Sequence, residues 1–340
     1  MNLIFFCPVK KSPVGGIKVI YRLSEVISTI LPEGSKSLVL HPNRPFFRPS
    51  WFKSGIQFRR MIFGLNFSGK LSFSNIKNIF DPENDIVVLP ETWVHKYASQ
   101  LHKFDIRFVI FVQNGYLMSK GNREEISAGY RNAVTILTVS DDCTKCVQQA
   151  FNINIEKISR VNLFVDPKKF ISAPRKEKII TYMPRKLGGH FEILRFFIGD
   201  RISSDWRFFP IDGCSEDKVA DSLSKSQIFL SLSNREGLGL PPIEAAMAGN
   251  YVIGYTGEGG KEFWEAPLFS EIHHGDFLAF AEAVIFLTQK IENSEAPDIS
   301  SHRSRLIKKF SEESQMQDVL ALMRKLDLVS SKVQDVSDIK

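Results

Sequence analysis

The sequence predicts an α/β protein with two tandem domains, each a parallel sheet covered by helices. Short apolar runs alternate with stretches of helical periodicity, which is the pattern of β-α units in a parallel sheet. The alternation stops at a polar, proline-containing stretch, residues 172–178, and then starts again. A length of 340 residues accommodates two such domains. We therefore expect two Rossmann-like domains that face a cleft, with ligands beyond the carboxyl ends of the strands.

The first half, residues 1–171, is expected to form one domain. Apolar runs bounded by turn residues predict strands, and amphipathic stretches predict helices. Strands are expected at 3–7, 37–40, 85–90, 107–114, 134–140 and 158–165, and helices at 17–30, 96–102 and 141–151. A turn that contains Gly15 and Gly16 separates the first strand from the first helix.

The second half repeats the alternation after the expected linker at 172–178. Strands are expected at 178–183, 206–211, 228–233 and 251–255, and helices at 190–199, 216–226, 241–249 and 276–290. We place the second domain at 179–300. Residues 301–340 are expected to hold a C-terminal helix, around 304–326, and a tail, and that helix could pack back on the first domain.

Composition excludes several classes of protein. The chain is 43% hydrophobic and 24% charged, as in soluble proteins with a sizeable core, which rules out a mainly disordered chain. Its apolar runs reach about five residues, whereas a membrane span needs about 20. The N-terminus has no basic region before its apolar run, so no secretory signal is expected. Four cysteines are too few for a disulfide scaffold, which favours a cytoplasmic location.

Cys143 and Cys146 form a C-x-x-C pair at the start of an expected helix. A helix N-terminus lowers the pKa of a thiol, so a redox pair is one interpretation. The alternative is two structural cysteines one helical turn apart. No second C-x-x-C or neighbouring histidine completes a metal site in the sequence, which favours the structural alternative.

The excess positive charge is confined to residues 34–80. The formal net charge is +6, and this segment holds eight Lys or Arg residues and no Asp or Glu. It is also rich in aromatic residues. One interpretation is a contact with an anionic membrane surface, at the inner face of the membrane, or with a phosphorylated acceptor. The other is a solvated basic face over a core. No nucleic-acid-binding motif is present, so no nucleic-acid partner is expected.

The most informative motif is N-R-E-G-L-G-L-P-P-I-E-A-A-M-A-G in the second half, where Glu236 and Glu244 are eight residues apart. About one such pair is expected by chance, and the chain has three, so the spacing alone means little. The surroundings of this pair carry the information. Gly237 and Gly239 allow backbone amides to approach a ligand closely.

Two prolines follow these glycines and suit the first turn of a helix, where amides have no intrahelical partner. Glu244 is then expected in that first turn, and Gly249 is placed to end the helix. One carboxylate on a loop, unpaired amides and a second carboxylate match the hydroxyls and phosphates of a sugar nucleotide.

This motif, with the G-E-G-G-K-E-F that follows the next strand, resembles the E-x7-E region of retaining GT-B glycosyltransferases of the glycosyltransferase family 4 type. The likeness extends to S-R-V-N-L-F-V-D-P-K-K-F at the end of the first half. It also includes I-T-Y-M-P-R-K at the start of the second half and the early Gly-Gly turn. In this family the first domain lies on the acceptor side and the second binds the sugar nucleotide.

The resemblance implies a role for each matched residue. Glu236 would contact the donor sugar at the reaction centre, and Glu244 would hold the ribose hydroxyls. The loop of Gly237, Leu238 and Gly239 would present its amides to the donor.

The resemblance also implies a clamp on the donor diphosphate. Arg185 and Lys186 would stabilise the charge of the leaving nucleotide. Gly15 and Gly16 would approach the diphosphate from the other domain. The family usually separates its arginine and lysine by several residues, whereas these two are adjacent.

The resemblance implies retaining, metal-independent transfer of a sugar from a nucleotide-sugar donor to a glycan or lipid-linked acceptor, in the biosynthesis of a surface polysaccharide. No D-x-D motif is present, and no cofactor or metal is expected. Three alternatives stay open: a sugar-nucleotide epimerase of the same architecture, a glycosidase that uses the two carboxylates, and a non-catalytic protein that binds anionic surfaces.

Overall fold

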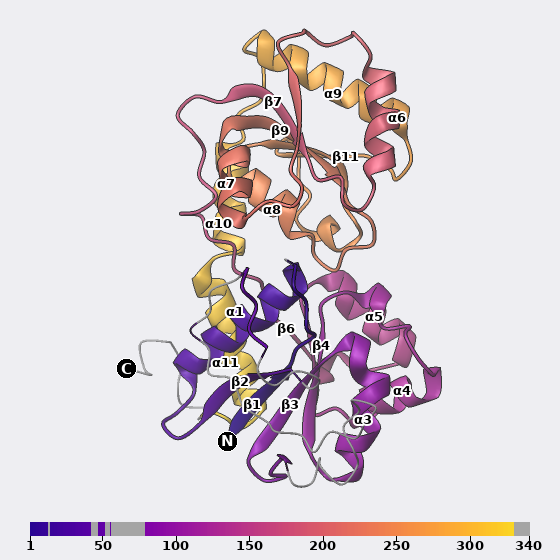
Figure 1. Cartoon of the computed structure of the whole chain (residues 1–340), viewed down its shortest axis with the longest axis vertical. Helices are drawn as coiled ribbons and strands as arrows, with labels where there is room; N and C mark the ends of the chain where they lie inside the picture. The colour runs from indigo at the N-terminus through magenta and orange to yellow at the C-terminus, as the bar shows by residue number, and fades with distance from the viewer. Residues whose placement is uncertain (13, 42–46, 52–54, 56–78, 330–340) are drawn as a thin grey trace. The chain divides into compact units, whose positions relative to one another are not determined.

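The computed structural model describes residues 1–12, 14–41, 47–51, 55 and 79–329, which form two compact units (Figure 1). Unit 1 comprises Met1–Leu163 and the residues from Gln315 onward, and unit 2 comprises Phe164–Ser314. Most of the basic, aromatic segment 34–80 lies outside the described residues, and so does most of its predicted membrane contact.

Unit 1 is built on a parallel sheet with the order β2-β1-β3-β4-β5-β6. Its strands are β1 (Asn2–Phe6), β2 (Lys36–Leu40), β3 (Asp85–Pro90), β4 (Arg107–Val112), β5 (Thr135–Thr138) and β6 (Ile158–Arg160). The central strands are buried along their length, which explains their continuous apolar sequences.

In the described part of unit 1, the helices connect these strands, except for one that follows unit 2 in the sequence. They are α1 (Gly15–Ile30), α3 (Val94–Lys103), α4 (Arg123–Asn132), α5 (Asp141–Phe151) and α11 (Glu312–Lys325), with short 3-10 turns η1 (Glu91–Trp93), η2 (Gly115–Leu117) and η3 (Ile155–Lys157). The Asp318 carboxylate of α11 accepts hydrogen bonds from the backbone N–H and the side-chain amide of Asn162, at 2.8 and 3.0 Å.

Unit 2 has a second parallel sheet, with the order β11-β10-β9-β7-β8. Its strands are β7 (Glu177–Tyr182), β8 (Arg207–Pro210), β9 (Ser226–Leu232), β10 (Tyr251–Tyr255) and β11 (Phe269–Glu271). Its helices are α6 (Gly188–Ile198), α7 (Glu216–Lys225), α8 (Leu240–Met247), α9 (Phe277–Glu292) and α10 (Ser300–Lys309), with a 3-10 turn η4 (Gly259–Glu262).

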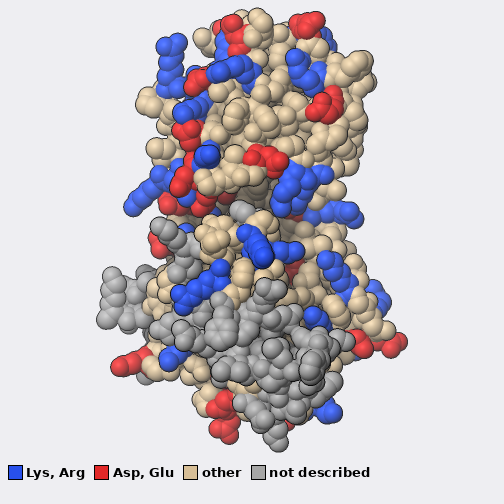
Figure 2. All heavy atoms as spheres, viewed as in Figure 1, with Lys and Arg blue, Asp and Glu red and all other residues tan. Residues whose placement is uncertain are grey.

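The core of unit 2 lies between its sheet and the pair α6 and α9, which pack on each other (Figure 1). Leu194 and Phe280, one from each helix, are fully buried there against Ile228 and Leu230 of β9. α8 contacts both α7 and α10. On the face that Figure 2 presents, Lys and Arg side chains of unit 2 are interspersed with Asp and Glu side chains.

Three expectations from the sequence differ from the structure. The strand expected at 158–165 ends at Arg160, because β5 offers pairing partners only as far as Thr138. Side chains of α11 then form hydrogen bonds with the backbone of Asn162.

The expected linker, 172–178, is anchored in unit 2. Its Lys176 side chain donates hydrogen bonds to three backbone carbonyls at the end of α7 and the start of β9, and its last two residues begin β7.

The third difference concerns the C-terminal region, where the single helix expected around 304–326 is two helices, α10 and α11. α10 belongs to unit 2, and most of α11 belongs to unit 1. Among the described helices, none combines the length and apolar character needed to cross a bilayer.

Replacing Phe280 by alanine should destabilise unit 2, whereas the same change at Phe286 on the same helix should not. Phe280 is fully buried and its loss leaves a cavity, which typically costs about 3–5 kcal/mol of unfolding free energy. Phe286 is 61% exposed, so we expect a change within about 0.5 kcal/mol. Urea unfolding of both variants measures the difference, and equal losses would contradict this packing of α9.

Candidate functional site

The strand orders place one topological switch point at the carboxyl edge of each sheet, where the connections leave in opposite directions. In unit 2 the chain leaves β7 toward β8 and leaves β9 in the opposite direction, toward β10, so the loops after β7 and β9 diverge. Such switch points bind ligands in doubly wound folds. Arg185 and Lys186 lie in the loop after β7, and Glu236 lies in the loop after β9.

The structure brings Lys186 and Glu236 together across this switch point. The Lys186 ammonium forms an ion pair with the Glu236 carboxylate, although the residues are 50 positions apart. The two side chains are 37% and 22% exposed, so an incoming ligand can reach both. Arg185 is exposed in the same loop. A partly exposed pair contributes about 1 kcal/mol or less to stability, so either side chain can exchange its partner for a ligand at little cost.

The backbone of Glu236 is held by the loop after β10. Its N–H donates a hydrogen bond to the Gly257 carbonyl at 2.6 Å, and its carbonyl accepts one from the Gly259 N–H at 3.2 Å. These bonds form a short parallel bridge between Glu236 and Glu258. The position of the carboxylate is therefore set by main-chain bonds as well as by its ion pair.

Glycines make this contact between the two loops possible. A Cβ atom on Gly259 would lie 2.0 Å from the Gly237 carbonyl oxygen, which no side chain can tolerate. Gly257 has a φ of +67°, in the left-handed region that favours glycine. This is the structural reason for the G-E-G-G sequence, whose role in holding Glu236 could not be read from the sequence.

The helix that follows Glu236 begins earlier than expected. Gly239, with a φ of +88°, is its N-cap, and α8 starts at Leu240, so Glu244 lies just beyond the first turn. The expectation that Glu244 sits in the first turn was wrong, because the helix starts before the two prolines. Leu238 is buried and anchors the loop between its two glycines. Gly249, with a φ of +78°, follows the last turn as predicted.

A cavity of about 150 Å³ lies beside this loop, at the carboxyl ends of β9, β10 and β11. Arg235, Glu258 and His274 contribute to its lining. Ligand pockets usually measure about 300–1,000 Å³, so this cavity is too small to enclose a nucleotide.

Gly15 and Gly16 belong to unit 1, where they follow β1 beside the switch point between β1 and β3. They are the first two residues of α1, not a turn before it, and their N-cap residue Val14 makes no capping bond through its side chain. A Cβ on Gly15 would meet no atom within 4 Å. The first amides of a helix have no intrahelical partners, so this end of α1 can receive an anion.

Sequence reasoning missed Glu91, which lies on the other side of the same switch point, directly after β3. Its side chain is buried, and burial raises the pKa of its carboxyl to about 7. Backbone N–H groups of Gln113 and Asn114 donate to it and lower that pKa, but by less than burial raises it. The sequence feature that could have identified Glu91 as a candidate is its position immediately after a buried strand.

The surroundings of the C-x-x-C pair favour the structural alternative. Cys143 and Cys146 form no disulfide, and burial raises the pKa of Cys143 to about 12 and also raises that of Cys146. A reactive pair requires the opposite shift. A Cβ on Gly115 would lie 2.7 Å from the Cys146 sulfur, so this thiol packs against the η2 turn.

Glu91 should make a contribution to stability that falls with rising pH. Between the ordinary glutamate pKa of 4.5 and the folded value of about 7, the folded state holds a proton that the unfolded state has released. The contribution of Glu91 is therefore lost as pH rises through this window, by up to about 3 kcal/mol. Burial lowers the pKa values of His41 and Lys176, which changes stability in the opposite direction, so the loss is measured against Glu91→Gln. From pH 5 to pH 8, urea unfolding should show a less favourable change in stability in the wild type and in the exposed-site control Glu125→Gln than in Glu91→Gln. An equal change in all three proteins would exclude Glu91 as the cause.

Comparison with known proteins gives one similar curated sequence, and no protein-family model matches the chain. An alpha-1,6-glucosyltransferase of Actinobacillus pleuropneumoniae serotype 7 (strain AP76) is 26% identical over 211 residues. The match covers 59% of this chain and 62% of that protein, so the chain spans less than two thirds of its relative.

Solved structures match over nearly the whole chain. Sucrose-phosphate synthase from Thermosynechococcus elongatus aligns with a TM-score of 0.71 and 14% identity, covering 97% of this chain and 100% of that one. Anabaena HepE, in complex with UDP-glucose, aligns with a TM-score of 0.70 and 12% identity, covering 95% and 99%. With its two parallel α/β units, this chain has the GT-B fold of glycosyltransferases.

Proposed function

We propose that this chain is a glycosyltransferase that moves a sugar from a nucleotide-sugar donor to a glycan or lipid-linked acceptor. One observation carries the proposal. Lys186 and Glu236, on the two loops that flank the switch point of unit 2, form an ion pair. These are the loops to which the E-x7-E resemblance assigns the donor diphosphate and the donor sugar.

We propose UDP-glucose as the donor to test first. The similar Actinobacillus protein is named an alpha-1,6-glucosyltransferase, and the HepE structure holds UDP-glucose. The identity to each is low, so these names guide the choice of donor and do not establish it.

In the proposed donor complex, the diphosphate competes with Glu236 for Lys186. A diphosphate carries more negative charge than a carboxylate, so Lys186 turns to the phosphates, joined by Arg185. The Glu236 carboxylate then becomes available to a hydroxyl of the donor sugar. Its negative charge also stabilises the oxocarbenium-like transition state, while Lys186 and Arg185 stabilise the leaving diphosphate.

The other proposed contacts complete the donor site. Glu244 accepts hydrogen bonds from the ribose hydroxyls, and the amides of Gly237, Leu238 and Gly239 face the donor. In unit 1, Gly15 and Gly16 present the N-terminal amides of α1 to the diphosphate. Cationic side chains and amides then take the place that a metal ion holds in other transferases, so we propose that no metal is required.

We propose a retaining reaction, in which the acceptor oxygen attacks on the face from which the leaving group departs. The acceptor hydroxyl loses its proton to the departing phosphate oxygen, so no separate protein base is needed. The acceptor is proposed to belong to a surface polysaccharide pathway. The contact of residues 34–80 with an anionic membrane stays a prediction.

Replacing Glu236 by glutamine should abolish sugar transfer while leaving the fold intact. The variant keeps the backbone bonds to the 257–259 loop but loses the charge that stabilises the transition state. We expect kcat to fall by about 100-fold or more, the size of effect seen when one electrostatic stabiliser is removed. The measurement is release of UDP from UDP-glucose with and without an acceptor glycan.

Glu282→Gln is the matched control, because Glu282 is 64% exposed and pairs with Arg201 on another surface of unit 2. Its turnover should equal that of wild type. Wild-type turnover in Glu236→Gln would refute the proposed role of Glu236. Conversion of the donor sugar without any acceptor would instead identify an epimerase.

Nucleotides of one base should raise the melting temperature of the wild type, and Glu244→Ala should remove that rise. A ligand present at 100 times its Kd stabilises the folded state by about 2.7 kcal/mol, or roughly 5–10 °C for a domain of about 150–250 residues that unfolds by itself, the size range of each unit. The panel comprises UDP, GDP, dTDP, CMP and their common sugar conjugates. A shift that persists in Glu244→Ala would place the ribose elsewhere, and no shift with any nucleotide would argue against a donor site.

A further inference from the structure

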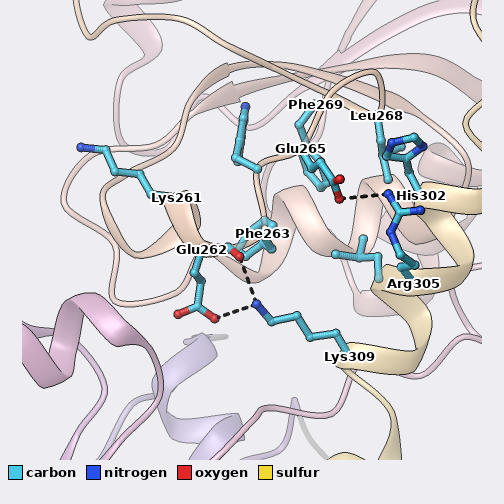
Figure 3. Close-up of a pocket in the computed structure, with 11 residues that line it drawn as sticks. Lys261, Glu262, Phe263, Glu265, Leu268, Phe269, His302, Arg305 and Lys309 are labelled. Atoms are coloured by element: carbon cyan, nitrogen blue, oxygen red, sulfur yellow. Dashed lines mark hydrogen bonds and ion pairs between the residues drawn. The ribbon is translucent and has the colours of Figure 1, made fainter.

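A second cavity on unit 2, of about 410 Å³, lies between α10 and the segment 261–269 (Figure 3). Its volume is within the range of about 300–1,000 Å³ that is typical of small-molecule sites. None of the residues proposed to bind the donor lines it. The cavity is therefore separate from the proposed donor-binding residues.

One wall of the cavity is aromatic. Trp264 and Phe263 line it, and each packs on Phe269, with ring centroids 4.8 and 5.5 Å apart. Phe263 and Phe269 are buried, whereas Trp264 is partly exposed. The rings are tilted to one another, so the partly exposed ring of Trp264 is the surface in this cluster that suits the C–H face of a sugar ring.

The polar groups of the cavity come in pairs of opposite charge. Arg305 and Lys309 extend from α10 toward Glu265 and Glu262, with N–O distances of 3.1 and 3.3 Å (Figure 3). Lys309 also donates a hydrogen bond to the Glu262 backbone carbonyl at 3.1 Å. The side chain of Glu262 is only 7% exposed, so this pair is largely built into the wall.

These ion pairs indicate whether the cavity suits an anionic ligand or a neutral one. Each lysine or arginine that lines the cavity has a carboxylate partner, since Lys261 pairs with Glu258 at 2.7 Å. A phosphate would have to displace those carboxylates. A hydroxyl both donates and accepts, so it can bridge a carboxylate and its cationic partner without breaking the pair. The lining therefore suits a neutral polyhydroxyl molecule better than an anion.

Trp264 adds an unmet hydrogen-bond donor. In the part of the chain that the structure describes, its indole Nε1 is buried and has no hydrogen-bond partner. A buried donor without an acceptor is costly, and native structures contain few. Because the Nε1 atom is closed to solvent, a ligand hydroxyl can accept this hydrogen bond only after the Trp264 ring turns to present its N–H to the cavity.

We propose that this cavity binds a neutral saccharide unit, with Trp264 as the stacking surface and the Arg305–Glu265 and Lys309–Glu262 pairs as hydroxyl ligands. The segment that forms its wall begins at Lys261, two residues after Gly259, whose N–H bonds to the backbone of Glu236. The site would hold part of a glycan acceptor away from the reacting hydroxyl, a use that rests on the proposed transferase function. Saccharide binding itself does not depend on that function.

The test is saturation-transfer NMR and calorimetry on the full chain with two neutral probes, isomaltotriose and maltotriose. We expect binding of at least one probe to the wild type, and at least a tenfold higher Kd in Arg305→Ala. Arg201→Ala is the matched control, because Arg201 is 49% exposed, forms an ion pair with Glu282 and does not line the cavity. Its Kd should equal that of the wild type. Trp264→Phe, which keeps an aromatic ring and removes the N–H, should also raise the Kd.

Three outcomes would overturn the proposal: no binding of either saccharide, an unchanged Kd in both Arg305→Ala and Trp264→Phe, or displacement of the saccharide by inorganic phosphate. The melting-temperature rise with the nucleotide panel is measured on the same variants and should be unaffected. Binding of the saccharide without binding of any nucleotide would refute the proposed function and support this site. Binding of a nucleotide without binding of either saccharide would refute this site and support the proposed function.

Discussion

Parallel strand pairing is the constraint on which the rest of this structure depends. Successive parallel strands require crossovers, and crossovers are right-handed, so a sheet that grows in both directions from its first strand must send its connections to opposite faces. The loops then separate between β1 and β3 in unit 1 and between β7 and β9 in unit 2. Both sets of residues predicted to bind a donor lie at these two points. The position of the predicted donor site therefore follows from the strand order alone, independently of any individual side chain.

Much of the fold could be predicted because the strands of a parallel sheet are buried on both faces and read as continuous apolar runs. β3, β4, β9 and β10 lie where such runs occur. α4 was not predicted, because its sequence is largely polar and only Ile126, Gly129 and Tyr130 of it are buried. The early end of β6 could not be predicted either. It depends on α11, more than 150 positions away, and sequence periodicity carries no information about such distant partners.

The candidate site, like the fold, could be predicted only in part from the sequence. The loop around Glu236 could be predicted because its glycines and prolines have local conformational meanings. The ion pair with Lys186 could not be predicted, because it joins two loops that are distant in sequence. The backbone hydrogen bonds of Glu236 with Gly257 and Gly259 could not be predicted either, because residue spacing does not indicate main-chain contacts between loops. These backbone bonds have a larger effect on the structure than the ion pair, since one added methyl group at Gly259 would meet a backbone oxygen at 2.0 Å. The partly exposed ion pair contributes little to stability and can exchange partners.

The return of α11 to unit 1 sets an order of folding. Val319, Leu320, Leu322 and Met323 of this helix are buried, and Asp318 and Gln315 bond to Asn162. A ribosome therefore releases the whole of unit 2 before it releases α11. Domains usually fold as units during synthesis, the N-terminal one first. Here the N-terminal unit cannot complete its core until α11 has been released, so a fragment that ends at Leu163 would lack part of its own core.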